Sequence, residues 1–201
     1  NVNCNSHNCY DITFDSDQIK TTITSSPYMV DHWISRILRF HRRRLHRLLV
    51  GLDVEWRPNF NRSRRNPAAT LQLCVGRRCL IFQLIHAPEI PHSLLHFLGD
   101  ETFTFVGVGI DQDARKLFDD YDLTVNNAVD LRSMAVDRTG RRDLRNAGLK
   151  DLAREILGRE IAKPKAVTMS RWDDEYLTSA QVAYASIDAF LSFEIGRSLS
   201  S

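Results

Sequence analysis

The stretch that most constrains the fold is residues 48 to 56, which read LLVGLDVEW. Its apolar start predicts a buried central strand that ends near Trp56. Side chains alternate along a strand, so Asp53 and Glu55 point to the same face, about 6 to 7 Å apart. Two such carboxylates repel each other and lose hydration unless a positive charge lies between them. A divalent cation would supply that charge; the alternative is that both acids reach solvent at the strand end.

The composition is that of a soluble globular protein with one domain. A chain of 201 residues can bury a substantial core, and its apolar fraction of 43% and charged fraction of 26% are ordinary. Lys and Arg exceed Asp and Glu by only 27 to 25, so attraction to a polyanion depends on where the charges lie. The arginines gather in three clusters, which suit phosphate contact or a solvated surface equally. These clusters are Arg42, Arg43, Arg44 and Arg47; Arg62, Arg64 and Arg65; and Arg141, Arg142 and Arg145.

The sequence carries no membrane-spanning or secretory signal. No stretch approaches the roughly 18 consecutive apolar residues of a membrane helix, and the polar N-terminus lacks a signal-peptide core. We therefore expect a cytoplasmic protein, with a nuclear fraction if the basic run 42–47 acts as a localisation signal. In that compartment Cys4, Cys9, Cys74 and Cys79 are expected to be reduced thiols.

Hydrophobic spacing and turn residues predict an N-terminal hairpin and helix before the central strand, and an antiparallel meander after it. The last helix opens at Thr178, with Gln181 three residues on in a capping-box arrangement. The expected strands are 9–14, 19–23, 48–56, 70–75, 79–84 and 103–108, and the expected helices are 27–46, 88–98, 149–157 and the one from 178.

Further acids lie at unusual places. Asp111 and Asp113 follow a Gly-Val-Gly turn from strand to helix, where Asp111 is expected to cap the helix. The helix dipole also favours an acid in the first turn, so Asp113 has a purely structural alternative. Asp188 lies inside the apolar last helix, four residues after Tyr184 and on the same helix face. A buried aspartate needs a partner, and a Tyr-Asp hydrogen bond is the structural alternative here.

These acids indicate a metal site if the fold brings them together. Asp53, Glu55, Asp113 and Asp188 would then carry a charge of about −4, with no matching Lys or Arg in their motifs. Oxygen ligands select hard cations such as Mg²⁺ or Mn²⁺. Two such ions about 3.5–4 Å apart activate a water and stabilise the leaving oxygen of a phosphodiester, and Tyr184 is placed to orient or deprotonate that water. A lysine ammonium in the gap would contradict this interpretation.

Three motifs carry a family resemblance. LDVEW at 52–56, GVGIDQD at 107–113 and YASID at 184–188 resemble the motifs of the DEDD, or DnaQ-like, 3′-to-5′ exonucleases. A tyrosine four residues before the last aspartate, with Ala183 where the histidine subtype carries its base, is similar to the DEDDy branch. The likeness extends over 48–197, where the segments around Leu149 and Trp172 resemble the Werner-syndrome-type exonuclease domain.

The resemblance implies an α/β fold of the ribonuclease-H-like, DnaQ-like exonuclease type, with a mixed sheet flanked by helices and an N-terminal hairpin. It implies a single exonuclease domain over 1–201, in which 1–47 form the hairpin and helix and 48–197 the motif core.

The resemblance also assigns roles to the motif residues. Asp53 would bridge two Mg²⁺ or Mn²⁺ ions, Glu55 and Asp188 would hold the nucleophile-side ion, and Asp113 would bind the second through water. Tyr184 completes the catalytic set, and the motif favours Asp113 over Asp111. Nucleic acid is expected to contact four residues: Arg62, Arg64, Arg65 and Trp172.

Within the family, the N-terminal YDITFD hairpin and the TSSP helix start look most like the small plant RISC-interacting clearing 3′-to-5′ exoribonucleases. That likeness implies single-stranded RNA as substrate, a homohexameric ring, and a role with Argonaute in removing cleavage fragments. Two alternatives stay open: a Werner-type exonuclease that acts on DNA, and a non-catalytic nucleic-acid-binding scaffold of the same fold.

Overall fold

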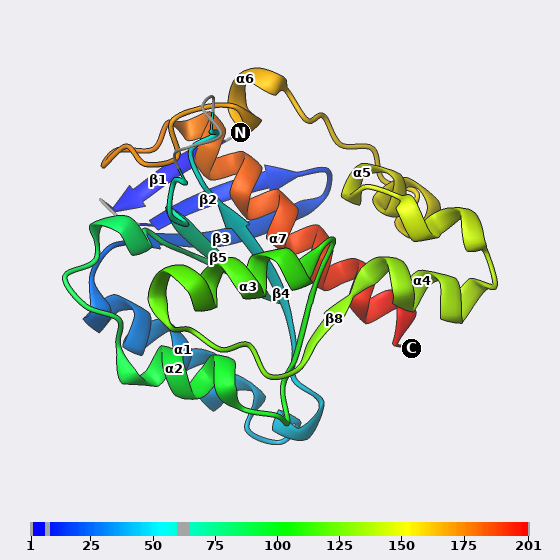
Figure 1. The fold of residues 1–201 in the computed structure, drawn as a ribbon, viewed down its shortest axis with the longest axis horizontal. Helices are drawn as coiled ribbons and strands as arrows, with labels where there is room; N and C mark the ends of the chain where they lie inside the picture. The colour runs from blue at the N-terminus through cyan, green and yellow to red at the C-terminus, as the bar shows by residue number, and fades with distance from the viewer. Residues whose placement is uncertain (1, 7–8, 60–64, 201) are drawn as a thin grey trace.

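A computed structural model describes residues 2–6, 9–59 and 65–200, with side chains from residue 9 onward. In these residues an eight-stranded mixed sheet lies between two layers of helices (Figure 1). The strand order is β1-β2-β3-β6-β5-β4-β7-β8. The strands are β1 (Val2–Ser6), β2 (Cys9–Phe14), β3 (Asp17–Thr24), β4 (Leu49–Glu55), β5 (Thr70–Val75), β6 (Arg78–Phe82), β7 (Thr104–Gly107) and β8 (Ala128–Asp130).

The helices lie on both faces of this sheet. α1 (Pro27–His41), α2 (His92–Gly99) and α3 (Ile110–Tyr121) cover one face, and α4 (Leu131–Thr139), α5 (Leu149–Leu152) and α7 (Ser179–Leu199) cover the other. The short elements are η1 (Leu45–Arg47), η2 (Leu84–His86), η3 (Arg142–Asn146), the π-helical turn η4 (Ala153–Leu157) and α6 (Lys165–Thr168). No helix in the described part of the chain is long and apolar enough to cross a membrane.

The central strand β4 joins an antiparallel half of the sheet to a parallel half. It pairs antiparallel with β5, and β5 pairs antiparallel with β6, which confirms the predicted meander. On its other edge β4 pairs in parallel with β7, and β7 with β8. The predicted hairpin is β2-β3, which joins the sheet through a parallel pairing of β3 with β6. The fold is thus the predicted ribonuclease-H-like mixed sheet.

Gly51 lets α7 lie directly on β4. A Cβ at this position would stand 2.7 Å from the backbone nitrogen of Phe193 and closer still to the carbonyl oxygen of Ala189. Real Cβ atoms do not approach other atoms so closely, so any larger residue would push the helix away. In Figure 1 α7 crosses the sheet diagonally, and it contacts β4, β5 and β6.

Two predicted helix boundaries are wrong. α1 ends at His41 rather than near residue 46, because the chain must turn back through η1 to enter β4. α2 begins at His92 rather than at residue 88, and Pro91 precedes it in an extended conformation. Proline has no N–H to donate and disfavours the helical conformation in the residue before it, which explains the late start.

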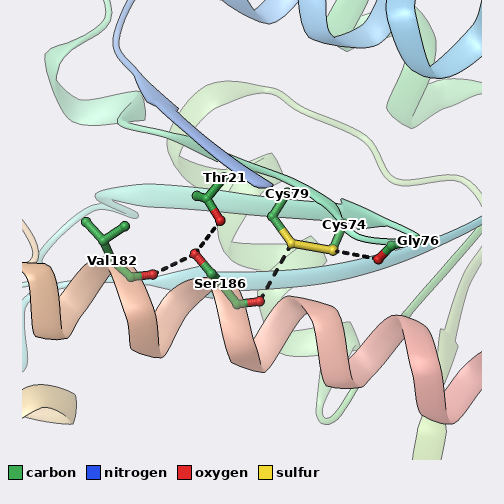
Figure 2. The surroundings of a disulfide bond; sticks show 6 residues. All are labelled: Thr21, Cys74, Gly76, Cys79, Val182 and Ser186. Atoms are coloured by element: carbon green, nitrogen blue, oxygen red, sulfur yellow. Dashed lines mark hydrogen bonds between the residues drawn. A yellow bond between two sulfur atoms is a disulfide. The ribbon is translucent and has the colours of Figure 1, made fainter. Parts of the chain in front are cut away.

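Cys74 and Cys79 form a disulfide, so the expectation of reduced thiols is wrong for this pair. They are directly opposite each other on β5 and β6, with Cα atoms 4.2 Å apart (Figure 2). α7 covers the bridge, since the carbonyl oxygen of Ser186 lies 3.7 Å from Sγ of Cys79. The Ser186 hydroxyl also accepts a hydrogen bond of 2.8 Å from Thr21. The sequence predicted both strands but not the register that places these sulfurs together.

Candidate active site

Asp53 and Glu55 lie at the carboxyl end of β4 and face α7. The alternate residues Val50 and Leu52 point into the core under α1 to α3, so the strand sends both acids to the opposite face. Because α7 packs on that face, it brings Asp188 close enough for its charge to act on Asp53 and on Glu55.

Asp113 completes the cluster from α3. The N-cap of this helix is Gly109 at φ 74°, and its N–H donates a 2.9 Å hydrogen bond to the carboxylate of Asp130. The expectation that Asp111 caps the helix is therefore wrong, because the cap needs a left-handed backbone that glycine adopts easily. Asp111 is exposed, whereas Asp113 is only 7% exposed and interacts with the charge of Asp53. The structure separates the two candidates in favour of Asp113.

Burial raises the pKa values of all four acids, and repulsion between carboxylates adds to the shift for three of them. Burial raises the pKa of Asp53 to about 7, with added repulsion from Asp188. Burial and the charge of Asp53 raise the pKa of Glu55 to about 10 and that of Asp113 to about 9. Burial also raises the pKa of Asp188, although Lys163 opposes this shift. The structure therefore gathers the four predicted carboxylates, and each resists ionisation.

A lysine lies in the cluster, which the sequence analysis did not foresee. Nζ of Lys163 donates a 2.6 Å hydrogen bond to Asp188 and lies 3.3 Å from the hydroxyl of Tyr184. The motifs themselves contain no Lys or Arg, as expected, but Lys163 from outside them supplies a basic partner. Lys163 comes from the irregular segment before α6, where neither periodicity nor a motif marked it.

Lys163 is close to the outcome that would contradict a metal site, but it does not fill the gap between the acids, because one ammonium does not satisfy the cluster. It pairs with a single carboxylate, and Oδ2 of Asp53 is buried with no hydrogen-bond partner among the described residues. In that part of the chain no three His, Cys, Asp or Glu side chains already form a set that could hold a metal ion. The donor chemistry still fits a hard divalent cation, because the cluster presents carboxylate oxygens, one of them buried without a partner.

The raised pKa values give the metal-free protein a pH-dependent stability. The native state holds protons on Asp53, Glu55 and Asp113 over pH values where the unfolded chain has released them. The free energy of unfolding should therefore fall as pH rises from about 4 to about 9. Asp53 alone contributes at most about 4 kcal/mol, at about 1.4 kcal/mol per pKa unit. Thermal unfolding in EDTA at pH 5, 7 and 9 measures this, and a melting temperature that rises with pH would contradict it.

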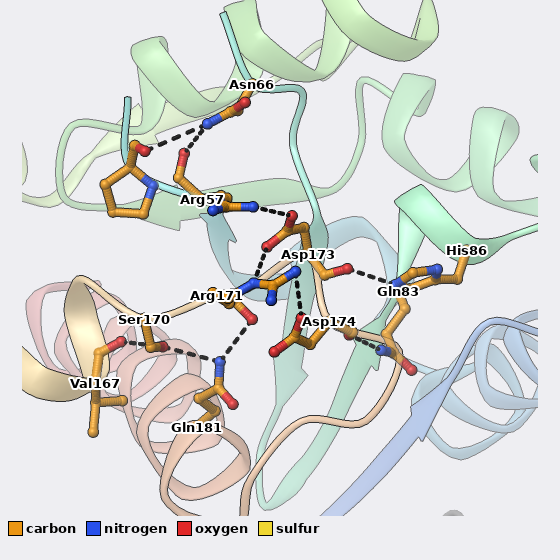
Figure 3. A network of polar contacts seen from close by, with 11 residues as sticks. Arg57, Asn66, Gln83, His86, Val167, Ser170, Arg171, Asp173, Asp174 and Gln181 are labelled. Atoms are coloured by element: carbon orange, nitrogen blue, oxygen red, sulfur yellow. Dashed lines mark hydrogen bonds and ion pairs between the residues drawn. The ribbon is translucent and has the colours of Figure 1, made fainter. Parts of the chain in front are cut away.

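A polar network holds the N-terminal end of α7 in position relative to β4 (Figure 3). Arg57, just after the central strand, pairs with Asp173 at 3.2 Å. Gln181 closes the predicted capping box with Thr178 and donates to the hydroxyl of Ser170 at 2.9 Å. This network holds the first turn of α7 in place. It thereby fixes the position of Tyr184 and Asp188 along β4.

The predicted nucleic-acid contacts are not confirmed by the structure. Arg62 and Arg64 lie outside the described residues. Arg65 pairs with Asp119 at 3.0 Å and with Asp120 at 3.4 Å, so its charge is offset within the protein. Trp172 is fully buried, which makes its predicted contact with nucleic acid wrong. Its ring centroid lies 6.0 Å from that of Tyr184, so Trp172 packs beside this residue of the site.

The sheet and the acid cluster together define a DnaQ-like nuclease domain, and comparison with known proteins agrees. A family model described as 3′-5′ exonuclease matches residues 23–201. A 3′-5′ exonuclease of Arabidopsis thaliana is 35% identical over 148 residues, which cover 73% of this chain and 50% of that protein. The bifunctional 3′-5′ exonuclease/ATP-dependent helicase WRN of Mus musculus is 30% identical over 152 residues, which cover 75% of this chain and 11% of that protein.

The solved structures include the EXD2 exonuclease domain soaked in Mg and GMP, which is 30% identical with a TM-score of 0.52. That match covers 89% of this chain and 87% of the other. The chain belongs to the 3′-to-5′ exonuclease family, in its DEDDy, DnaQ-like group. It spans half or less of the length of the curated relatives named above.

Proposed function

We propose that this chain is a 3′-to-5′ exoribonuclease that hydrolyses single-stranded RNA with two divalent cations. The observation that carries the proposal is the convergence of four carboxylates and Tyr184 around a buried, unpartnered oxygen of Asp53. A structural cluster would be expected to satisfy that oxygen, since an unpaired buried polar group costs free energy.

Each residue of the cluster has a proposed role in holding the cations or the attacking water. Asp53 would contact both cations, Glu55 and Asp188 would hold the one beside the attacking water, and Asp113 would hold the other through water. When bound, Mg²⁺ or Mn²⁺ supplies the positive charge that eases ionisation of water and offsets charge on the leaving oxygen. Burial and the charge of Asp188 raise the pKa of the Tyr184 phenol in the metal-free protein. We assign Tyr184 to orienting the attacking water.

The preference for RNA is supported by the likeness of the N-terminal hairpin and helix start to the plant exoribonucleases. Most of that hairpin precedes residue 23, where the family match begins. The likeness to WRN keeps open the Werner-type alternative, in which the chain acts on DNA. EXD2 domains were soaked with GMP and with dGMP, which leaves the choice of sugar to experiment.

Matched oligonucleotides test the substrate. We expect a 5′-labelled 20-nucleotide RNA to be shortened from its 3′ end in Mg²⁺ or Mn²⁺, and the DNA of the same sequence to be degraded more slowly, because only RNA offers 2′-hydroxyl contacts. Asp53→Asn protein, which lacks one of the proposed ligands, excludes contaminating nuclease. Faster loss of DNA would favour the Werner-type alternative, and two intact strands would favour a non-catalytic scaffold.

Lys163 should act as a stand-in for a cation in the metal-free protein. Lys163→Met should lower metal-free stability by about 1–2 kcal/mol, because Asp188 loses a charged hydrogen bond. It should also tighten Mn²⁺ binding, because the ammonium no longer competes. Unfolding in EDTA and titration calorimetry measure the two effects, with exposed Lys165→Met as the control. Unchanged Mn²⁺ affinity would show that Lys163 lies outside the cation's space.

Substitutions at Asp111 and Asp113 test which of the two aspartates belongs to the active site. Asp113→Asn should lower kcat by at least about tenfold, on the scale of losses at metal sites. Asp111→Asn should leave kcat within about twofold, because that side chain is exposed and outside the cluster. Steady-state hydrolysis measures both, and equal losses would refute the assignment.

The likeness to the plant exoribonucleases also leads us to propose a homohexameric ring, an Argonaute partner and a cytoplasmic location. Light scattering of the purified chain tests the assembly, since a hexamer has six times the mass of the 23.1 kDa chain.

A further inference from the structure

A basic surface lies at the end of β4 opposite the carboxylates. The turn from α1 into β4 is at the bottom of Figure 1, and the β5-β6 turn lies at the same end of the sheet because its residues pair beyond Gly51. At about 3.3 Å per residue, the length of β4 puts this surface about 20 Å from Glu55. We call it the basic platform, and it consists of Phe40 with Arg36, Arg39, Arg42, Arg43, Arg44 and Arg78.

Phe40 is the centre of the platform. Its side chain is 54% exposed, so it forgoes most of the stabilisation that burying a phenylalanine gives the fold. Three guanidinium groups surround its ring: Cζ of Arg78 lies 4.8 Å from the ring centroid, Cζ of Arg39 5.8 Å and Cζ of Arg36 5.9 Å. Arg78 comes from β6, so two separate segments converge on one ring. An open depression of about 700 Å³ beside it is lined by residues 39–44.

The positive charge of the platform is not offset within the described residues. None of its six arginines forms an ion pair with a carboxylate there, whereas neighbouring Arg77 pairs with Asp17 at 2.6 Å. Burial and the charges of Arg44 and Arg78 lower the pKa of His41, as expected where positive potential accumulates. A helix C-terminus favours cations in its last turn, but this does not account for Arg78 or for the exposed ring.

We propose that the basic platform binds single-stranded nucleic acid, with a base stacked on Phe40 and phosphates held by the arginines. Sequence-independent single-strand sites combine these two elements, a positively charged surface and an aromatic ring. A duplex would hide its base faces, and an acidic peptide would use the charges but have no flat base to stack on the ring. In the proposed exonuclease the platform would hold the strand away from its reacting end, yet its binding does not depend on catalysis.

Binding in EDTA tests the platform without hydrolysis. We expect the full chain to bind a 20-nucleotide oligouridine by fluorescence anisotropy, and Phe40→Ala and Phe40→Leu to weaken it by about fivefold or more. Phe40→Trp should bind as the wild type does, because it preserves stacking. Arg42→Gln with Arg43→Gln should reduce the salt slope by about 0.7 for each phosphate that the variant no longer binds. Arg142→Gln with Arg145→Gln, another exposed basic pair, is the matched control and should change nothing.

Two outcomes would overturn the proposal. If Phe40→Ala binds normally and polyglutamate displaces the RNA as well as unlabelled RNA does, the surface is a general polyanion site. If the control pair weakens binding as much as Arg42 and Arg43, the effect is non-specific charge. Hydrolysis of a trinucleotide, too short to reach the platform, should be unchanged in all Phe40 variants. A wild-type chain that binds the 20-mer but cuts no oligonucleotide would refute the proposed function and leave the platform intact.

Discussion

Asp53→Asn is expected to reduce turnover by at least about 100-fold while leaving the metal-free protein as stable as the wild type or more stable. The loss of turnover follows because Asp53 is the one acid in the cluster with a buried oxygen that has no partner among the described residues. Changes to residues that only support a metal ligand already cost about 10–100-fold, and a direct ligand should cost more. The stability follows because the pKa of Asp53 is raised to about 7, so its ionised form destabilises the fold.

Hydrolysis rates and thermal unfolding in EDTA measure the two halves of this prediction. Asp188→Asn is the informative companion: it relieves the same repulsion but leaves Lys163 without its 2.6 Å partner, so any gain in stability should be smaller. Adding Mg²⁺ should raise the melting temperature of the wild type more than that of Asp53→Asn, if the ions bind the native state only. A clear fall in metal-free melting temperature for Asp53→Asn would contradict this explanation of its raised pKa.

Gly51→Ala is expected to destabilise the protein by about 3 kcal/mol or more and to lower activity as well. The added methyl group would meet the backbone of α7 at Ala189 and Phe193, and backbone cannot rotate away as a side chain can. Overpacking a core commonly costs about 1–3 kcal/mol, and occasionally more. Because α7 carries Asp188, a displaced helix also separates the acids. Urea unfolding and hydrolysis rates measure both effects.

Gly99→Ala is the matched control for this change. A Cβ at Gly99 would meet only the side chain of Asn126, at 3.9 Å, which is ordinary van der Waals contact. We expect its stability to stay within about 1 kcal/mol of the wild type. If Gly51→Ala were equally mild, α7 would have to tolerate a shift that the structure shows no room for.

Local patterns predicted the parts of the fold that local chemistry determines. The apolar run of β4 with its two acids, the β5-β6 hairpin and the capping box of Thr178 and Gln181 all appear as expected. Each depends on residues a few positions apart, whose burial or hydrogen bonding the spacing alone specifies. The convergence of the motif residues was predicted in a different way. The family resemblance implied the sheet that brings them together, and local spacing alone did not.

The errors concern contacts between separate helices, strands and loops, some close in the sequence and others far apart. Asp111 has the chemistry of a cap, but Asp130 from β8 holds Gly109 in that position instead. Cys74 and Cys79 form a bridge because of strand register, and Lys163 reaches Asp188 across 25 residues of chain. Trp172 was expected to contact nucleic acid, yet it is fully buried beside α7. No periodicity records such encounters, because they depend on how separate elements pack.

The place of α7 in the chain bears on how the protein is made. Asp53 and Glu55 emerge from the ribosome before Tyr184 and Asp188, which are translated more than a hundred residues later. Domains form during synthesis from the N-terminal side, and contacts between remote segments close late. A nascent polypeptide that stops short of residue 179 therefore holds only part of the acidic cluster. Hydrolytic competence should arise only once translation has passed this helix.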